Sequence, residues 1–372
     1  MTRSRILVVD DEPGMLHAVE RVLGTTYDIV ALGSSRAALA TARELKPHLA
    51  IVDIRMPEMD GFELMAQLQG ESPDLQIILM TGSIDDLDEK LIRALRSPAF
   101  YFIQKPFDRD VLKTLVERCL ELQWRREQHR RQLERLETEM AEARAFQQSL
   151  LPEPASFVNG LAISCRYIPW RGMGGDLCDY AAAGGQRTAL LIADVSGHGV
   201  SAAMLTGVVK SAFHAARAEG YEPLSVIHRA WNALAAFGPE RFVTLVAALV
   251  APAERQLRYV NAGHPACVVW GNGRDPVWMA STGPLVSPAL APVWEVETVS
   301  VQSSDHILLY TDGVSDVLAN SDGDASEEIV AAIGREPRGG GFLLDAIVED
   351  VHRRLAGDPQ SDDLTMLTAL LR

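Results

Sequence analysis

The segment Leu190–Met204, LLIADVSGHGVSAAM, decides the fold of the C-terminal half of the chain. Its apolar run ends at Asp194, a Gly-His-Gly turn follows, and Ser-Ala-Ala-Met has the composition of a helix start. This order predicts a buried strand, a flexible loop and a helix. A carboxylate at the mouth of a buried strand is costly unless a partner offsets its charge, so Asp194 is a candidate site residue.

Further aspartates of the C-terminal half also stand where an apolar run meets a loop. They are Asp176 and Asp179 in GGDLCD, Asp312 in YTDG, and Asp362 and Asp363 in SDDLTML. Each alone would be an ordinary turn or cap residue, but the joint pattern favours a site. Because no Cys or His set has the spacing of a zinc site, an all-oxygen set suits Mg²⁺ or Mn²⁺. Two such ions ~3.5–4 Å apart would share a bridging carboxylate and activate a water for attack on phosphorus.

The rest of residues 151–372 shows strand-like runs such as FVTLVAALV, LRYVNAG and LTMLTALL, with helical patterns at Ser201–Ala218 and Pro223–Phe237. We expect one α/β domain with predominantly antiparallel strand pairing. His198 and His264, both in Gly-His contexts, are expected to be loop or structural residues and not metal ligands.

Residues 1 to about 120 instead alternate short apolar runs with amphipathic stretches, the pattern of a parallel sheet of βα units. Polar residues follow four of these runs, at the carboxyl ends that a parallel sheet brings to one edge. They are Asp10, Asp11, Asp53, Thr81 and Lys105. Three carboxylates held together raise one another's pKa unless a cation such as Mg²⁺ offsets their charge. A lysine and a hydroxyl beside them suit phosphoryl transfer onto an aspartate.

The segment Asp108–Leu150 has no glycine and is densely charged. Apolar residues recur along it at intervals of three and four, which favours a helical coiled-coil connector that begins as the last helix of the first domain. We expect a homodimer through residues 112–150; the alternative is one long solvated helix lying on a domain. The counted positions are Leu112, Leu115, Cys119, Leu122, Arg126, His129, Leu133, Leu136, Met140, Ala143, Gln147 and Leu150.

Bulk composition narrows the class of protein. A chain of 372 residues exceeds one ordinary core, so two domains and a connector are expected. A net charge of −15, from 35 basic and 50 acidic residues, argues against binding of DNA or of an anionic membrane. Four scattered cysteines and the lack of a signal peptide or bilayer-spanning stretch indicate a cytoplasmic protein with reduced thiols.

The motifs VVDDE, VDIRMPEMDG, MTG and QKPF of the first part resemble the receiver domain of two-component response regulators, across residues 1–120. The resemblance implies a flavodoxin-like, doubly wound parallel sheet and a sensor histidine kinase as partner. It also implies roles for single residues: Asp53 as phosphoacceptor and metal ligand, Asp11 as metal ligand, Asp10 as a helper through water, the Arg55 carbonyl as a third ligand, Thr81 as switch hydroxyl, Phe102 as switch aromatic, and Lys105 as the phosphate-contacting lysine.

The motifs MGGDLCD, ADVSGHGVSAAM, NAGHP, LLYTDGVSD and SDDLTML are similar to metal-dependent protein phosphatases of the type 2C class, best to the bacterial branch related to sporulation and stress-response phosphatases. EARAFQQSLLPEP resembles the helical switch element that precedes the domain in that branch. The resemblance implies an α-β-β-α sandwich over residues 151–372, with residues 121–150 as the helical linker. It further implies two Mn²⁺ or Mg²⁺ ions, bridged by Asp194 and held by the Val195 carbonyl, Asp312 and Asp363, with Asp176 acting through water.

These interpretations combine into one hypothesis. Phosphorylation of Asp53 would control a metal-dependent phosphoserine or phosphothreonine phosphatase whose substrate is an anti-sigma-factor antagonist or a similar small phosphoprotein. The alternative is a non-catalytic sigma-factor adaptor that keeps a phosphatase-like fold only to bind a partner. Degenerate metal ligands would be the mark of that adaptor, whereas Asp176, Asp194, Asp312 and Asp363 are all present.

Overall fold

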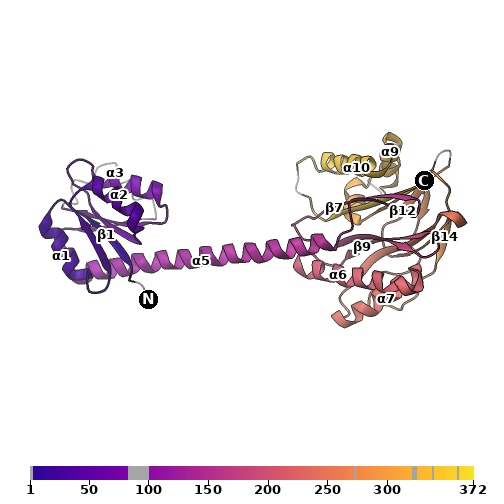
Figure 1. Cartoon of the computed structure of the whole chain (residues 1–372), viewed down its shortest axis with the longest axis horizontal. Coiled ribbons are helices and arrows are strands. Elements are labelled where there is room, and N and C mark those ends of the chain that lie inside the picture. The colour runs from indigo at the N-terminus through magenta and orange to yellow at the C-terminus, as the bar shows by residue number, and fades with distance from the viewer. Residues whose placement is uncertain (1–2, 83–99, 272–273, 321–324, 337–338, 358–359) are drawn as a thin grey trace. The chain divides into compact units, whose positions relative to one another are not determined.

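The computed structural model describes residues 3–82, 100–271, 274–320, 325–336, 339–357 and 360–372. The chain divides into two compact units, residues 1–138 and 139–372, and the division falls inside one helix (Figure 1). None of the described helices has the length and hydropathy that a bilayer span requires.

The first unit is a five-stranded parallel sheet with the strand order β2-β1-β3-β4-β5. Its apolar strands alternate their side chains between two cores, Ile6 and Val8 on one face and Leu7 and Val9 on the other. This order and pairing confirm the predicted flavodoxin-like fold. The elements are β1 (Arg5–Val9), α1 (Pro13–Leu23), β2 (Asp28–Leu32), α2 (Ser35–Leu45), β3 (Leu49–Asp53), α3 (Gly61–Glu71), β4 (Gln76–Thr81) and β5 (Phe100–Gln104).

Helix α5 (Arg109–Leu150) runs without interruption for 42 residues. Its first turns bury Leu112, Val116 and Cys119 in the receiver core, as expected for the last helix of that domain. Two of the residues counted on the coiled-coil seam are therefore unavailable to a partner chain, because the helix must first bury a face against its own sheet. Farther along, Leu133 and Leu136 are about half exposed, at 48% and 56%.

The second unit stacks two antiparallel sheets, with the strand orders β14-β11-β10-β9-β8 and β13-β12-β15-β16-β7-β6 (Figure 1). The strands are β6 (Ala155–Val158), β7 (Leu161–Ile168), β8 (Asp176–Ala183), β9 (Arg187–Val195), β10 (Val243–Ala251), β11 (Gln256–Ala262), β12 (Cys267–Trp270), β13 (Val277–Met279), β14 (Glu297–Ser300), β15 (His306–Tyr310) and β16 (Leu364–Leu371).

Helices cover the outer face of each sheet, which confirms the predicted α-β-β-α sandwich. On one side lie α6 (Val200–Ala215), η1 (Ala216–Glu219), α7 (Pro223–Leu234) and η2 (Ala235–Phe237), and on the other α8 (Asp312–Leu318), α9 (Ser326–Arg335) and α10 (Gly340–Leu355). A short turn, η3 (Pro252–Glu254), joins β10 to β11. The expected helices ending at Ala218 and Phe237 each finish as 3₁₀ turns, η1 and η2.

Alternation along the central strands decides where the acidic residues point. Leu190 and Ile192 of β9 lie between the two sheets, whereas Leu191 and Ala193 face the helices α6 and α7. Asp194 follows the same alternation, so its side chain belongs to the face between the sheets. A carboxylate is thereby brought to the edge of the sandwich core.

Two candidate acidic sites

The receiver site lies at the carboxyl ends of β1 and β3. Oxygen atoms of Asp10, Asp11 and Asp53 all come within 4.8 Å of one another. The Lys105 ammonium lies 2.7 Å from Asp10 Oδ2 and 2.6 Å from Asp53 Oδ1. The parallel sheet thus brings together residues that are up to 95 positions apart in the chain, as the strand-end argument predicted.

Burial and the charge of Lys105 shift the pKa of Asp53 in opposite directions. Burial raises the pKa of Asp53, with the charge of Asp10 adding to it, while Lys105 and the Arg55 N–H oppose the rise. Burial lowers the pKa of Lys105, but its hydrogen bonds to Asp10 and Asp53 and the charges of the two carboxylates together outweigh that and raise it. Three carboxylates, two of which pair with the one lysine, have the donor set and the excess negative charge that a hard divalent ion fits.

The other predicted receiver residues lie around this cluster. Thr81 ends β4, and its carbonyl accepts a hydrogen bond of 2.7 Å from the Lys105 N–H. The Arg55 N–H donates to Asp53 Oδ2 at 3.1 Å. Phe102 lies in β5 beside Leu79 and packs against the core on the α2–α3 face of the sheet. The backbone that follows β3 therefore supplies a donor to the Asp53 carboxylate.

The candidate site aspartates of the second unit come from four elements that meet at one end of the sandwich. Asp176 begins β8 and pairs directly with Asp194 in β9. Asp312 begins α8 immediately after β15, and Asp363 directly precedes β16. Burial, followed by the charges of Asp312, Asp362 and Asp363, raises the pKa of Asp194 to about 7.

The other carboxyl groups of this set are perturbed in the same direction. Burial and the charge of Asp194 raise the pKa of Asp176, although the Thr311 hydroxyl donates to it at 2.7 Å. Burial also raises the pKa of Asp363, which the N–H groups of Trp170 and Gly175 oppose at 2.8 and 2.7 Å. Among the described residues of this unit, no three carboxylates come as close together as those of the receiver. Because burial and neighbouring carboxylate charges raise the pKa of each of these groups, the four aspartates form a set of mutually repelling acids, called the acidic ring below, which suits divalent cations.

Two adjacent glycines allow the close approach in this ring. A Cβ atom on Gly174 would overlap the Asp363 carboxylate, and one on Gly175 would lie 2.5 Å from the Val195 carbonyl oxygen. The same Gly175 position is 3.5 Å from Asp194 Oδ1. The predicted backbone ligand, the Val195 carbonyl, therefore shares its surroundings with Asp194 because no side chain separates them.

Asp179 does not belong to this ring. Three positions after Asp176 on one strand, its side chain points to the opposite face, toward α6. There it accepts hydrogen bonds from Lys210 and His214, at 2.5 and 2.9 Å. The second aspartate of GGDLCD, Asp179, is thus the buried acid of a separate ion pair with the half-buried Lys210.

The two histidines that the sequence analysis excluded as metal ligands, His264 and His198, differ in burial and in their contacts. His264 is buried, and its imidazole contacts the Thr244 hydroxyl at 2.8 Å and the Tyr310 carbonyl at 3.0 Å. Burial lowers its pKa to about 4. His198 is exposed and meets the Trp170 ring edge-on, with centroids 6.1 Å apart.

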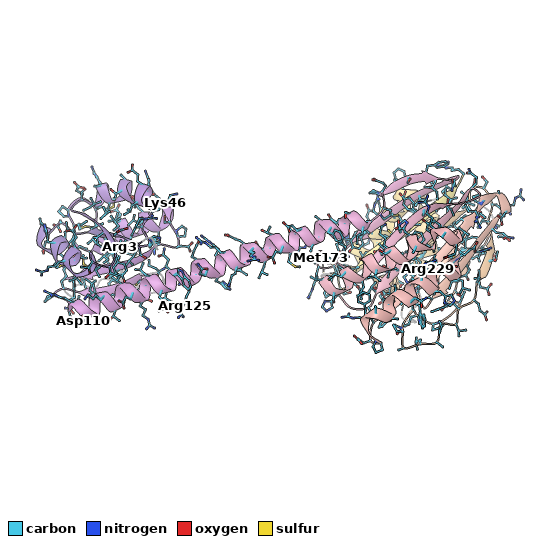
Figure 2. All side chains as sticks on the ribbon, turned by 60° about the horizontal axis from the view of Figure 1, so that its bottom comes forward. Arg3, Lys46, Asp110, Arg125, Met173 and Arg229 are labelled. Atoms are coloured by element: carbon cyan, nitrogen blue, oxygen red, sulfur yellow. The ribbon has the colours of Figure 1, made fainter. Side chains whose placement is uncertain are left out.

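One residue of the site escaped the sequence analysis. Gln147 of α5 is 5% exposed, its Nε2 donates to the Gly174 carbonyl at 2.6 Å, and its Oε1 accepts from the Gly174 N–H at 3.3 Å. The Tyr167 hydroxyl lies within hydrogen-bond distance of both, 3.4 Å from Gln147 Oε1 and 3.0 Å from the Gly174 nitrogen. The signal in the sequence was a polar glutamine at a position where the repeat of apolar residues along the helix would place an apolar side chain. Figure 2 labels Met173, which precedes Gly174 in the loop that Gln147 holds.

Comparisons with known families match both units. The model of the family described as Stage II sporulation protein E (SpoIIE) matches residues 184–372, and that of the response regulator receiver domain matches residues 6–117. Regulatory protein AtoC of Escherichia coli (strain K12) is 36% identical over 125 residues, which are 32% of this chain and 26% of AtoC. DNA-binding response regulator MtrA of Mycolicibacterium smegmatis is 35% identical over 106 residues, 28% of this chain and 45% of MtrA. The chain thus spans from about a quarter to about half the length of these curated relatives.

Two solved structures share the fold of the second unit. The SiaA-PP2C domain of Pseudomonas aeruginosa superposes with a TM-score of 0.56 at 19% identity, covering 64% of this chain and 98% of that domain. The RsbU and RsbW domains of Rv1364c from Mycobacterium tuberculosis give a TM-score of 0.51 at 22% identity, covering 59% of this chain and 62% of theirs. At these identities the likeness concerns the fold alone.

Proposed function

We propose, for a chain that belongs to the Stage II sporulation protein E (SpoIIE) family and carries a response regulator receiver domain, that phosphorylation of Asp53 controls metal-dependent hydrolysis of phosphoserine or phosphothreonine. The observation that carries the enzymatic part is the ring of Asp176, Asp194, Asp312 and Asp363, in which burial and neighbouring carboxylates raise the pKa of Asp194 to about 7. Such crowding of acids at the end of a sandwich is maintained at a cost to stability unless cations offset it.

The proposed ligands follow from this ring. Asp194 would bridge two Mg²⁺ or Mn²⁺ ions, the Val195 carbonyl, Asp312 and Asp363 would complete their protein ligands, and Asp176 would act through water. When bound, such ions polarise the phosphate and activate a water molecule. The chain itself orients the ring, since Thr311 holds the Asp176 carboxylate and the N–H groups of Trp170 and Gly175 hold that of Asp363.

The receiver would accept a phosphoryl group on Asp53 from a sensor histidine kinase. Lys105, which lies 2.6 Å from Asp53 Oδ1, is positioned to contact an oxygen of the phosphorylated aspartate. A Mg²⁺ ion would be held by Asp11, Asp53 and the Arg55 carbonyl, with Asp10 contributing through water. Thr81 and Phe102 would respond as the switch hydroxyl and switch aromatic.

The signal would pass along α5. This helix begins in the receiver core, where Leu112 and Cys119 are buried, and ends with Gln147 bonded to Gly174. Gly174 borders Asp363, so a shift of the helix end changes the placement of a carboxylate in the phosphatase ring. We propose that phosphorylation activates the phosphatase by stabilising the Gln147–Gly174 contact.

We further propose that the active form is a homodimer paired along α5. Leu133 and Leu136 stand three apart on this helix, about half exposed in a single chain, and pairing would remove them from water. Since Leu112 and Cys119 are buried in the receiver and Gln147 is buried against Gly174, the pairing seam would be the part of α5 from Leu133 to Ala143.

The substrate would be a small cytoplasmic phosphoprotein such as an anti-sigma-factor antagonist. Incubation with phosphorylated antagonist proteins in the presence of Mn²⁺, and detection of released phosphate, tests it. Release that Asp194→Ala abolishes supports the enzyme. If neither form releases phosphate from these proteins or from p-nitrophenyl phosphate, the non-catalytic adaptor is the correct interpretation.

A further inference from the structure

We propose that Arg144, Arg171 and Arg241, together called the basic rim, bind acidic side chains that flank the phosphorylated residue of the substrate. The inference rests on the proposed phosphatase function and adds a substrate preference to it. The three arginines come from α5, from the loop before β8 and from the loop before β10, and each borders a backbone segment that carries the acidic ring.

Arg171 stands beside the loop that holds Asp363. Its guanidinium lies 4.1 Å from the centroid of the Trp170 ring, and the Trp170 N–H donates to Asp363 Oδ1 at 2.8 Å. The indole therefore fixes an exposed cation directly beside a backbone donor of the ring. Arginine also has the planar fork of donors that pairs with carboxylates.

Arg144 reaches the same loop from the end of α5. Its Nε atom lies 2.8 Å, and its Cζ 3.0 Å, from the place where a Cβ on Gly172 would be. Gly172 has φ of +84°, so a glycine is suited to this position on backbone grounds as well. The exposed guanidinium of Arg144 thus rests on the backbone one residue after Arg171.

Arg241 lies beside a second loop of the ring, the one that follows Asp194. Its Nη1 lies 3.6 Å from the Cβ position of Gly197, in the loop that follows Asp194. The Ser196 N–H donates to the Phe242 carbonyl at 2.9 Å, which ties the loop to the segment next to Arg241. His198 of this loop touches Trp170, so the loops bordered by Arg171 and Arg241 meet each other.

None of these three arginines has an ion pair with a carboxylate in the described residues, although several exposed arginines of the same unit do, such as Arg229 with Glu219. A single unpaired arginine on a surface is ordinary. Three around one acidic ring, in a chain with 50 acidic and 35 basic residues, place positive potential where the substrate enters. Because the phosphate is expected at the ring itself, the basic rim is left to bind acidic groups beside it.

A pair of peptides tests the proposal on the full-length protein. One phosphoserine peptide carries glutamates on both sides of the phosphoserine, and the other carries glutamines at the same positions. The first readout is the ratio of the kcat/KM values of the two peptides with Mn²⁺. The second is the ratio of their affinities in the presence of a chelator, which measures binding without turnover. We expect the wild-type chain to prefer the acidic peptide about tenfold at low salt, and this preference to fall as salt rises.

Substitutions of the three arginines test whether the basic rim causes that preference. Arg144→Gln, Arg171→Gln and Arg241→Gln should each reduce the ratio about threefold, and Arg144→Lys should keep most of it because it retains the charge. Arg217→Gln, an exposed arginine of η1, is the matched control and should leave the ratio unchanged. A ratio of one for the wild-type chain, or a preference that survives all three substitutions together, overturns the rim. Failure of the phosphatase proposal is seen separately, as absence of Mn²⁺-dependent hydrolysis of p-nitrophenyl phosphate by the wild-type chain.

Discussion

The side-chain amide of Gln147 holds the backbone of Gly174 at both of its polar atoms: Nε2 donates to the carbonyl at 2.6 Å, and Oε1 accepts from the N–H at 3.3 Å. Since Gly174 borders the Asp363 carboxylate, this contact joins the end of α5 to the acidic ring. The contact is a direct link from the connecting helix to the proposed chemistry.

Replacement of Gln147 by Glu should reduce phosphatase activity without unfolding the domain. Glutamate keeps the shape of the side chain but loses the donor, which leaves the buried Gly174 carbonyl unpartnered at a cost of about 1–3 kcal/mol. We expect kcat for p-nitrophenyl phosphate to fall at least about tenfold while the chain still unfolds in a cooperative transition, with a melting temperature lowered by roughly 2–4 °C per kcal/mol of lost stability. Gln148→Glu, at the exposed neighbouring position, is the control. Equal activity of Gln147→Glu and the wild-type chain would refute the role of this contact.

Asp194→Asn should abolish metal-dependent stabilisation together with activity. Ligands that bind only the folded state stabilise it by about 2.7 kcal/mol at a hundred times Kd, so Mn²⁺ should raise the melting temperature of the wild-type chain by several degrees. The Asn variant should show little of this rise, because the bridging carboxylate is gone. Thermal denaturation with and without Mn²⁺ measures the difference, and Glu254→Gln, an exposed acid in η3, serves as control. The proposed ligand set is wrong if Asp194→Asn responds to Mn²⁺ like the wild-type chain.

Asp53→Asn should remove the response to a small acyl-phosphate donor. The wild-type chain, treated with acetyl phosphate or beryllofluoride and Mg²⁺, is expected to hydrolyse its substrate faster, whereas the variant should keep its untreated rate. Asp28→Asn, at the exposed start of β2, should respond like the wild-type chain. No change of rate on treatment of the wild-type chain would disprove the coupling through α5.

Glutamates at Leu133 and Leu136 should break the proposed dimer. Both side chains are about half exposed in one chain, and burial of a charge in a helix seam is costly. Sedimentation should show a dimer for the wild-type chain and a monomer for Leu133→Glu/Leu136→Glu, while Gln132→Glu on the same helix stays dimeric. A wild-type monomer at all accessible concentrations contradicts the proposal.

His264 should contribute a loss of stability to the phosphatase domain between pH 7.5 and 5, opposite in sign to the contribution of Asp194, whose pKa is raised to about 7. The folded pKa of His264 is about 4, below the ordinary value of 6.5, so the unfolded chain takes up a proton on this group first and folding loses free energy as pH falls through this range. The loss from this group alone is about 2 kcal/mol at pH 5. His264→Gln should therefore lose about 2 kcal/mol less than the wild-type chain over that interval, as measured by urea denaturation at both pH values.

The matched comparison is His352→Gln, an exposed histidine of α10. It should follow the wild-type pH dependence. A His264→Gln chain that loses as much stability as the wild-type chain would show that the buried imidazole does not set this dependence.

Much of the fold was readable from the sequence because it depends on local periodicity. Alternating apolar runs and amphipathic stretches predicted the parallel receiver sheet, and the strand-end rule predicted that Asp10, Asp53 and Lys105 would converge. The same reasoning predicted that Asp176 and Asp194 would lie together at one end of the second domain. It was wrong to treat Asp179 alongside Asp176, since an odd separation along a strand reverses the side chain.

The sequence by itself determined which residues could form each strand and helix, and which strand ends carry carboxylates, because these properties depend on neighbours a few positions apart. Tertiary structure alone decided that Gln147 meets Gly174, that Arg144 rests on Gly172, and that Leu112 and Cys119 face the receiver core and not a partner helix. These contacts join segments that are far apart in the chain or that compete for one helix face. Their pairing depends on how sheets and helices pack around a whole core, which no local pattern specifies.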